Sequence, residues 1–330
     1  MSLKSFGKVE VLYRKNPNSF VLIPIFLITL ALFSVSLPGK FFTVSNFSSI
    51  AFQLPELGIL TIAMAITMLS GGINLSIIAT ANLAGIIMAT IMKSQSLVAN
   101  LSGVNLVTLA IVVGLSTSVI IGFINGIIIS YIGVSPILAT LGTMTLLNGI
   151  SILTTKGYVI SGLPDEMIAV GNNSILGIPI PFIIFIIIAI VINFWLRKTT
   201  SGLSNYLVGS NENAANYSGI NTRKVLLKTY TISGLLSGIA AIIMISRFNS
   251  ARAGYAESYL LVTVLASVFG GFDPNGGSGR IPNLIFSLFI LQMVASGLNL
   301  LGISSHLAGA LWGTILIVVM LLQNKRKNKS

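Results

Sequence analysis

Few residues of this sequence can carry acid–base, nucleophilic or metal chemistry. Among its 330 residues are seven carboxylates, a single histidine (His306) and no cysteine. Without cysteine there are no disulfides, thiolate metal sites or cysteine nucleophiles, and one histidine makes neither a histidine-based zinc site nor a catalytic triad. The phosphate-loop pattern G-x-x-x-x-G-K-[ST] is absent, and "GGSGR" at 276–280 has neither its spacing nor its lysine. We therefore predict that the chain is not an enzyme and holds no metal and no cofactor of its own.

The carboxylates bear on how a membrane carrier would be driven. They are Glu10, Glu56, Asp165, Glu166, Glu212, Glu257 and Asp273. Carriers driven by protons or sodium usually keep ionisable residues at membrane depth, but the hydrophobic pattern places these seven in loops or near helix ends. Glu56, after Pro55, is nearest to an exception; we expect an interfacial role, with a coupling acid as the alternative. Sodium sites made of carbonyl and hydroxyl oxygens need no carboxylate and remain an alternative. Without such a site, uphill transport needs energy from a partner.

The composition indicates a polytopic membrane protein. The chain is 54% hydrophobic and only 8% charged, with a mean hydropathy of +0.95, whereas soluble domains carry about 25% charged residues. Its net charge of +12 does not indicate nucleic-acid binding, because most cations gather at the two termini and in one loop. These cations are Lys4, Lys8, Arg14 and Lys15, then Arg197, Lys198, Arg223, Lys224 and Lys228, and finally Lys325, Arg326, Lys327 and Lys329. By the positive-inside rule all three segments should be cytoplasmic, beside the membrane lipid.

Apolar runs near 20 residues long predict the helices that position these groups. The expected spans are 20–37, 48–70, 75–93, 105–131, 134–154, 178–196, 229–247, 282–301 and 303–322, with a shorter, tilted or broken one at 258–271. About ten spans place both termini on the same side, and the loop 197–228 after the sixth span falls on that side too. We predict an all-α fold in which residues 1–330 form a single transmembrane domain.

The polar stretch "VGSNENAANYSGINTRKVLLKTY" at 208–230 interrupts the apolar sequence. Asn211 is a good helix N-cap, "ENAANYS" makes about two turns, and Gly219 is a natural stop after the C-terminus. Asn221 or Thr222 can cap the following helix. The stretch therefore predicts a short surface helix on the cytoplasmic side, which either transmits motion from a soluble partner or is a plain connector.

Four stretches together resemble the permease subunits of bacterial ABC sugar importers, of the ribose and autoinducer-2 type. The polar stretch resembles their cytoplasmic loop, G-x-N-x-x-A-A-x-x-x-G-I followed by basic residues. "SGGINLS" at 70–76, "TLGTMTLLNGIS" at 140–151 and "FGGFDPNGGSGRI" at 269–281 resemble three further family segments. The resemblance covers about residues 50–325. It departs at Asn74, where the family usually has Asp. An amide forms hydrogen bonds but carries no charge, so this sequence does not support a carboxylate at position 74, and the commonest sugars of the family are not implied as its solute.

The resemblance implies an ATP-driven importer in the bacterial inner membrane. Two permease subunits, identical or related, form the path for a simple sugar, two ATPase subunits bind ATP and Mg²⁺, and a periplasmic or lipid-anchored binding protein delivers the sugar. The short helix would then be the coupling helix. The ATPase contact implied is Gly209, Asn211, Glu212, Ala214, Ala215, Gly219, Ile220, Arg223 and Lys224; lipid-headgroup contact by the cations is the alternative.

Two other groups of residues receive expected roles. The path or gate comprises Ser70, Gly71, Gly72, Asn74, Thr140, Thr143, Asn148, Gly270 and Gly271. A tight Gly-Gly turn at 70–74 and plain helix packing at 140–148 are the alternatives. Arg247, Arg252 and Glu257 would face a binding protein on the outer side, or serve as interfacial anchors. For the whole chain, the alternatives are a permease for a nucleoside or another neutral solute and an ATPase-independent carrier.

Overall fold

The computed structural model describes residues 17–327. The side chains of the predicted basic clusters at residues 4–15 and 325–329, and of His306, lie outside the described part. Within that part the chain forms 14 helices. They are α2 (Pro17–Ser36), α3 (Val44–Leu69), α4 (Ile77–Met92), α5 (Gln95–Asn100), α6 (Gly103–Ser130), α7 (Pro136–Thr155), α8 (Asp165–Asn172), α9 (Ile180–Lys198), α10 (Thr200–Ser210), α11 (Glu212–Tyr217), α12 (Thr222–Phe248), α13 (Tyr259–Phe269), α14 (Ile281–Leu300) and α15 (Ser305–Lys327).

Four two-residue strands add a small departure from the all-α expectation. β1 (Ile160–Ser161) pairs antiparallel with β4 (Ser250–Ala251), and β2 (Ser174–Ile175) pairs with β3 (Ile178–Pro179). Every predicted span coincides with one of the helices. Six of these helices, α3, α6, α7, α9, α12 and α14, are long and apolar enough to cross a membrane, and α2, α4, α13 and α15 contain shorter apolar segments.

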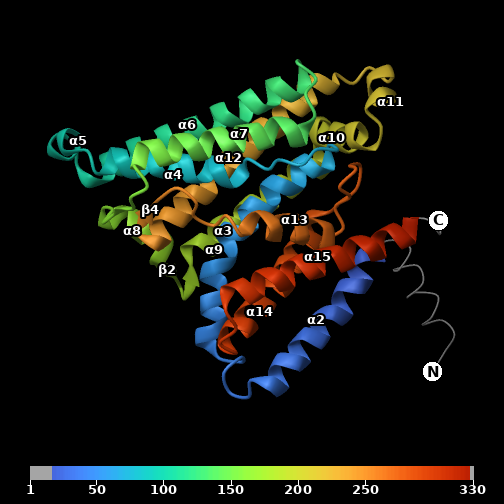
Figure 1. Ribbon diagram of the computed structural model, residues 1–330, viewed down its shortest axis with the longest axis horizontal. Helices are drawn as coiled ribbons and strands as arrows, with labels where there is room; N and C mark the ends of the chain where they lie inside the picture. The colour runs from blue at the N-terminus through green and yellow to red at the C-terminus, as the bar shows by residue number, and fades with distance from the viewer. Residues whose placement is uncertain (1–16, 328–330) are drawn as a thin grey trace.

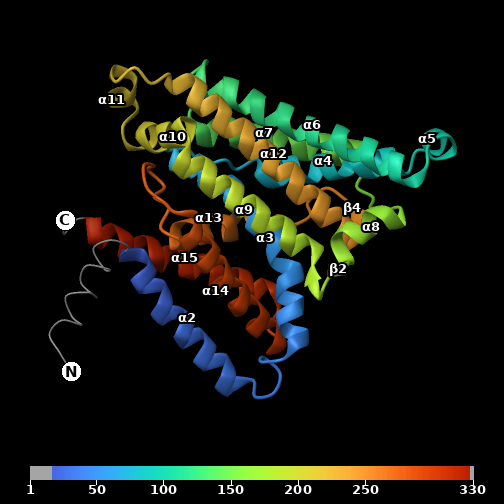
Figure 2. The same cartoon turned by 180° about the vertical axis from the view of Figure 1, so that it is seen from behind.

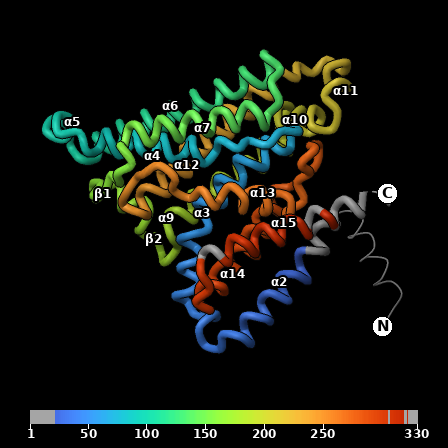
Figure 3. The backbone as a smooth tube through the Cα atoms, in the orientation of Figure 1, coloured from blue at the N-terminus to red at the C-terminus, as the bar shows by residue number. Residues whose placement is uncertain are grey.

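The apolar helices run back and forth between two ends of the molecule (Figure 1). One, which we call the α11 end, carries α10, α11 and the loop between α13 and α14; the other, the α8 end, carries α5, α8 and the strands (Figures 1 and 2). Helix α2 begins and helix α15 ends close together, on the side of the molecule that carries the α11 end (Figure 1). The path of the chain between them can be followed in the backbone tube (Figure 3). Both ends of the described chain therefore lie toward the segment that the sequence singled out.

Helices α3 and α12 form the centre of the bundle. Of the 18-residue apolar segment of each helix, 83% is buried in α3 but only 22% in α7. α12 packs against α3, α4 and α6, and its contact with α6 is close because Gly122 and Gly234 face one another. Small residues allow helix backbones to approach in lipid. The central helices are therefore closely packed, and α7 borders them with one face free.

Candidate functional site

Helix α11 forms as the sequence predicts. The Asn211 side chain accepts a hydrogen bond from the Ala214 amide at 2.9 Å, which satisfies a donor that the helix cannot. Gly219 has a φ of +82°, a conformation that costs glycine little. Asn221 caps α12 by accepting from the Lys224 amide at 3.0 Å. The segment 197–228 is nevertheless not one short helix, because α10 precedes α11 and α12 begins at Thr222.

Helix α11 has one side seated on the protein and one side free. Ala215 is buried in a cluster with Val208 and Leu226, while Ala214 is exposed. Tyr217 is 93% exposed, and it is the residue that sequence reasoning missed here. Beside it lies a polar groove of about 400 Å³ lined by Asn216, Gly219, Ile220, Asn221, Thr222 and Arg223. A rigid helix with an exposed aromatic and a neighbouring groove is a suitable docking surface for a protein.

The glycine-rich loop 270–280, which joins α13 to α14, contacts both α10 and the end of α3. The Gly277 amide donates to the Leu69 carbonyl at 2.9 Å, and the Tyr206 hydroxyl of α10 donates to the Gly279 carbonyl at 3.0 Å. Burial raises the pKa of Tyr206, against smaller opposing effects of Arg197 and Arg280, which favours the protonated form that donates this hydrogen bond. The structure thus brings the predicted coupling and gate segments into direct contact.

A second connection runs from α10 into the bundle. Asn205, which is fully buried, donates from Nδ2 to the Ile66 carbonyl at 3.3 Å and accepts from Thr229 Oγ1 at 3.1 Å. One amide side chain therefore holds α10, α3 and α12 together. Asn205 thus connects α10 to the last turn of α3 and to α12.

Replacing Gly209 by alanine should loosen this junction. A methyl group at Gly209 would overlap the Leu69 carbonyl oxygen and the backbone of Gly277, so α10 or the loop must move. We expect a loss of about 1–3 kcal/mol in stability and reduced uptake, measured by thermal unfolding in detergent and by transport assays. Gly313→Ala in α15, where a methyl group meets nothing within 4 Å, should leave both unchanged or slightly raise stability. Equal behaviour of the two variants would contradict the close packing at Gly209.

The segment 70–76 is a non-helical connection between α3 and α4 in which Ser70, Gly72, Asn74 and Ser76 are buried. Asn74 is its centre. Its Nδ2 donates to Ser233 Oγ at 3.0 Å, and its Oδ1 accepts from the Ser76 amide at 3.1 Å and from Ser76 Oγ at 2.7 Å. Ser233 in turn donates to the Ala63 carbonyl at 3.0 Å. Irregular backbone at membrane depth requires such partners, because lipid supplies none.

This network continues to α7. Asn125 donates from Nδ2 to Ser76 Oγ at 2.9 Å and accepts from Thr143 Oγ1 at 2.6 Å. Thr140 Oγ1 accepts from the Leu75 amide at 3.1 Å. Of the predicted path residues, Asn74, Thr140 and Thr143 therefore belong to one buried polar chain that links α12, α6 and α7, whereas Asn148 lies half-buried farther along α7.

The other predicted gate residues lie near the α11 end. Ser70 closes α3 by donating to the Thr67 carbonyl at 2.8 Å, and Gly71 follows it with a φ of +84°. Gly270 closes α13 and packs against Leu284. Gly71 lies against Gly276 of the glycine-rich loop. The two predicted gate segments are thus neighbours in space.

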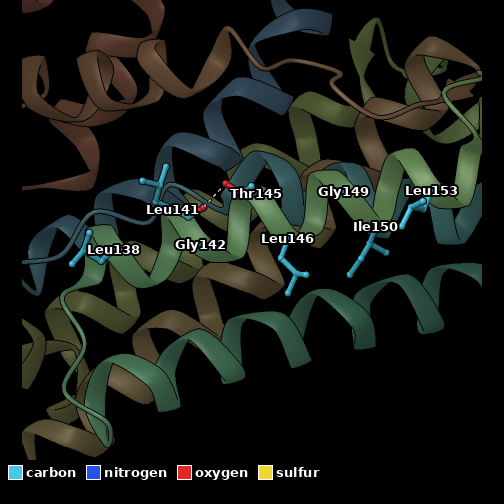
Figure 4. Close-up of a pocket in the computed structure, with 8 residues that line it drawn as sticks. All are labelled: Leu138, Leu141, Gly142, Thr145, Leu146, Gly149, Ile150 and Leu153. Carbon is cyan, nitrogen blue, oxygen red and sulfur yellow. Dashed lines mark hydrogen bonds between the residues drawn. The ribbon is translucent and has the colours of Figure 1, made fainter.

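Helix α7 presents an open groove on its free face (Figure 4). The groove has a volume of about 700 Å³ and is lined by Leu138, Leu141, Gly142, Thr145, Leu146, Gly149, Ile150 and Leu153. Figure 4 shows apolar side chains along one helix with Gly142 and Gly149 between them. This face can pack against lipid or another apolar helix.

At the α8 end, the structure corrects two expectations. Arg247 does not stand free on the surface: its side chain is 17% exposed, and its Nη1 lies 3.2 Å from Glu56 Oε1. Glu56 does not lie near a helix end: it lies inside α3 and is fully buried in the protein. Helix α3 begins at Val44, earlier than predicted, which moves Glu56 away from the helix end. Arg252 and Glu257 are exposed as expected, and Asp165 and Glu166 on α8 are exposed at the same end.

Comparison with known proteins shows which proteins this chain is similar to. The family profile described as "Branched-chain amino acid transport system / permease component" matches residues 46–320. Ribose import permease protein RbsC of Bacillus subtilis (strain 168) is 35% identical over 285 residues, 85% of each chain. Autoinducer 2 import system permease protein LsrD of Escherichia coli (strain K12) is 33% identical over 270 residues, 80% of this chain and 79% of LsrD. No solved structure matches the chain.

The match spans most of the helical bundle, including the α11 end and the buried polar chain. The apolar helices on which it falls are those expected of a multi-pass protein of the bacterial inner membrane. The chain therefore belongs to the family of permease components described for branched-chain amino acid transport systems.

Proposed function

We propose that this chain is the membrane-spanning subunit of an ATP-driven ABC importer for a simple sugar, such as a ribose-like pentose, a hexose or an autoinducer-2-like furanose. The observation that carries the proposal is the α11 end. There a capped helix with an exposed aromatic lies on α10, and α10 contacts the glycine-rich loop and the end of α3. The printed names of the relatives, ribose and autoinducer 2 import permeases, support a sugar as solute.

The interior chemistry supports a neutral solute. The polar groups of this hydrogen-bonded chain are amides and hydroxyls, namely those of the buried Asn74, Ser76, Asn125 and Ser233 and of the half-buried Thr143. Such groups exchange hydrogen bonds with a polyol without requiring a counter-charge. A nucleoside or another neutral solute is the alternative within this class. The family is described by branched-chain amino acids, which are zwitterions. The uncharged amides and hydroxyls named here offer no opposite charges to such a solute.

The partners follow from this function. ATPase subunits, which hold ATP and Mg²⁺, dock on α11; the permease itself binds no cofactor. A periplasmic or lipid-anchored binding protein meets the exposed charges at the α8 end, and a second permease, a copy or a related chain, packs on the α7 groove. Both termini and α11 then lie in the cytoplasm, where Arg197, Lys198 and Lys228 also meet anionic lipid headgroups. Residues 1–330 act as one permease domain.

Gentle purification from native membranes tests the proposal. We expect an ATPase subunit with a phosphate loop to stay bound in stoichiometric amount, as identified by mass spectrometry. Liposomes containing that complex should take up labelled ribose or a related sugar only with ATP and the binding protein. Competition with unlabelled nucleosides distinguishes the alternative solute. Recovery of this chain alone, active in liposomes without ATP, would identify an ATPase-independent carrier and overturn the proposal.

A further inference from the structure

A buried charged cluster joins three helices at the α8 end. Glu56 of α3 is fully buried. Its Oε1 accepts a hydrogen bond from the Tyr259 hydroxyl of α13 at 2.7 Å and lies 3.2 Å from Nη1 of Arg247 in the last turn of α12. Its other oxygen, Oε2, is buried without a hydrogen-bond partner among the described residues. The function proposed above uses none of these groups.

The cluster lies where α3 is locally weakened. Pro55 precedes Glu56 inside the helix, and a proline removes one helical hydrogen bond and favours a bend. Arg247 also donates to the Phe52 carbonyl at 3.3 Å, one turn before Glu56. The guanidinium thus holds both the side chain and the backbone of α3 at the place where the helix can bend.

The exposed surface of the α8 end is attached to the same turn of α12. Asn172 of α8 donates from Nδ2 to the Ser246 carbonyl at 2.9 Å. Asn249, with a φ of +50°, accepts from the Leu163 amide through Oδ1 at 2.8 Å. The β1–β4 pair adds a third attachment just after Asn249. A protein that presses on α8 or on the strands therefore acts on the residues on either side of Arg247.

The same three helices also meet at the α11 end. There the Gly277 amide, in the loop after α13, donates to the carbonyl of Leu69, the last residue of α3, and Asn205 of α10 bridges Ile66 of α3 and Thr229 of α12. α3, α12 and α13 are therefore linked at both ends, by the charged cluster near the α8 end and by these hydrogen bonds of the glycine-rich loop and of Asn205 at the α11 end. A change in one tie alters how the helices lie at the other.

A buried ion pair contributes little net stability, because removing two charges from water offsets their attraction. Such pairs are better suited to selecting between arrangements than to strengthening one, and an oxygen left without a partner makes this one less favourable still. We infer that Glu56, Arg247 and Tyr259 form an outer latch: positioning residues that hold α3, α12 and α13 in the resting arrangement until docking at the α8 end releases them. This inference rests on the proposed function.

The test is Glu56→Gln in the purified complex of permease and ATPase subunits, reconstituted in lipid, with ATP hydrolysis measured with and without loaded binding protein. The amide keeps the shape but loses the charge that holds Arg247. We expect basal hydrolysis to rise about tenfold, within the range of allosteric couplings, and stimulation by the binding protein to fall correspondingly. The binding-protein concentration for half-maximal stimulation should stay unchanged, because the docking surface is intact.

Two further variants keep the result interpretable. Tyr259→Phe removes a single hydroxyl and should raise basal hydrolysis in the same direction even if Glu56→Gln fails to fold. Gln292→Met breaks a different polar contact of α3, in which Gln292 Nε2 donates to Gln53 Oε1 at 3.1 Å, and should leave basal hydrolysis unchanged. Unchanged basal hydrolysis in both latch variants, with normal stimulation, would overturn the latch alone. A wild-type complex without stimulated hydrolysis would instead overturn the proposed function.

Discussion

Replacing Tyr217 by alanine should abolish most ATP-driven uptake while leaving the chain folded and inserted. The ring is 93% exposed on α11, so its removal costs the isolated subunit little. Exposed tyrosines that anchor an interface typically carry 2 kcal/mol or more of binding energy. We expect the affinity for the ATPase subunit to fall roughly thirtyfold, measured by titrating the purified subunits, and uptake to fall with it.

The alanines of α11 separate docking from folding. Ala214→Arg places a bulky charge on the exposed side and should block the ATPase subunit while the unfolding temperature stays unchanged. Ala215→Arg should also stop transport, but by a different route, because Ala215 is buried against Val208 and Leu226 and a charge there unseats the helix. Only the second variant should unfold at a lower temperature.

The matched control for Tyr217 is Tyr158→Ala. Tyr158 is 75% exposed and follows α7 at the α8 end, so its loss should leave ATPase affinity at the wild-type value. Normal uptake and normal ATPase binding in Tyr217→Ala and Ala214→Arg together would mean that α11 is only a connector.

The short helix could be predicted from sequence because its signals are local. Asn211 and Gly219 act through the backbone of their own neighbours, so their role does not depend on the rest of the fold. The positions of the spans follow likewise from continuous apolar runs. These features need no knowledge of which helices meet.

Helix α10 and Tyr217 could not be found in this way. The polar residues of α10 become buried only because the glycine-rich loop and the end of α3 cover them, as with Asn205. The exposure of Tyr217 depends on which side of α11 packs on α10. Both are tertiary facts, so a sequence of small and polar residues predicts only a loop.

The partners of the Glu56 carboxylate could not be predicted from the sequence either. Glu56 and Tyr259 are separated by 203 residues, and nothing near Glu56 in sequence announces a cation. A carboxylate after a proline at the edge of an apolar run therefore suggested the membrane interface. The fold buries Glu56 inside α3, where Arg247 from α12 pairs with it.

Position 74 differs from the family pattern, and the structure indicates that an amide is needed there. Family resemblance leads one to expect Asp, but the buried chain uses both halves of an amide. Nδ2 donates to Ser233, and Oδ1 accepts twice from Ser76. A carboxylate can replace the accepting half only.

Asn74→Asp should therefore destabilise the protein by about 1–3 kcal/mol, the cost of a buried polar group left without its partner, and reduce uptake. Ser233 would have to turn its hydroxyl from the Ala63 carbonyl toward the new carboxylate, so one hydrogen bond is lost in any arrangement. Thermal unfolding in detergent and sugar uptake in liposomes measure the two effects. Asn100→Asp is the control, because Asn100 is exposed at the end of α5 and should tolerate the change.

A double-mutant cycle then tests whether the chain acts as a unit. Asn74→Leu leaves the buried Ser76 amide without its acceptor, and Ser233→Ala leaves Nδ2 of Asn74 without its own. The double variant has only one of these losses, because the Asn74–Ser233 bond is removed with both partners. Its destabilisation should be smaller than the sum of the two single effects by about 0.5–3 kcal/mol. Simple additivity, or wild-type stability in Asn74→Asp, would mean that Ser233 finds another partner and that position 74 does not require an amide.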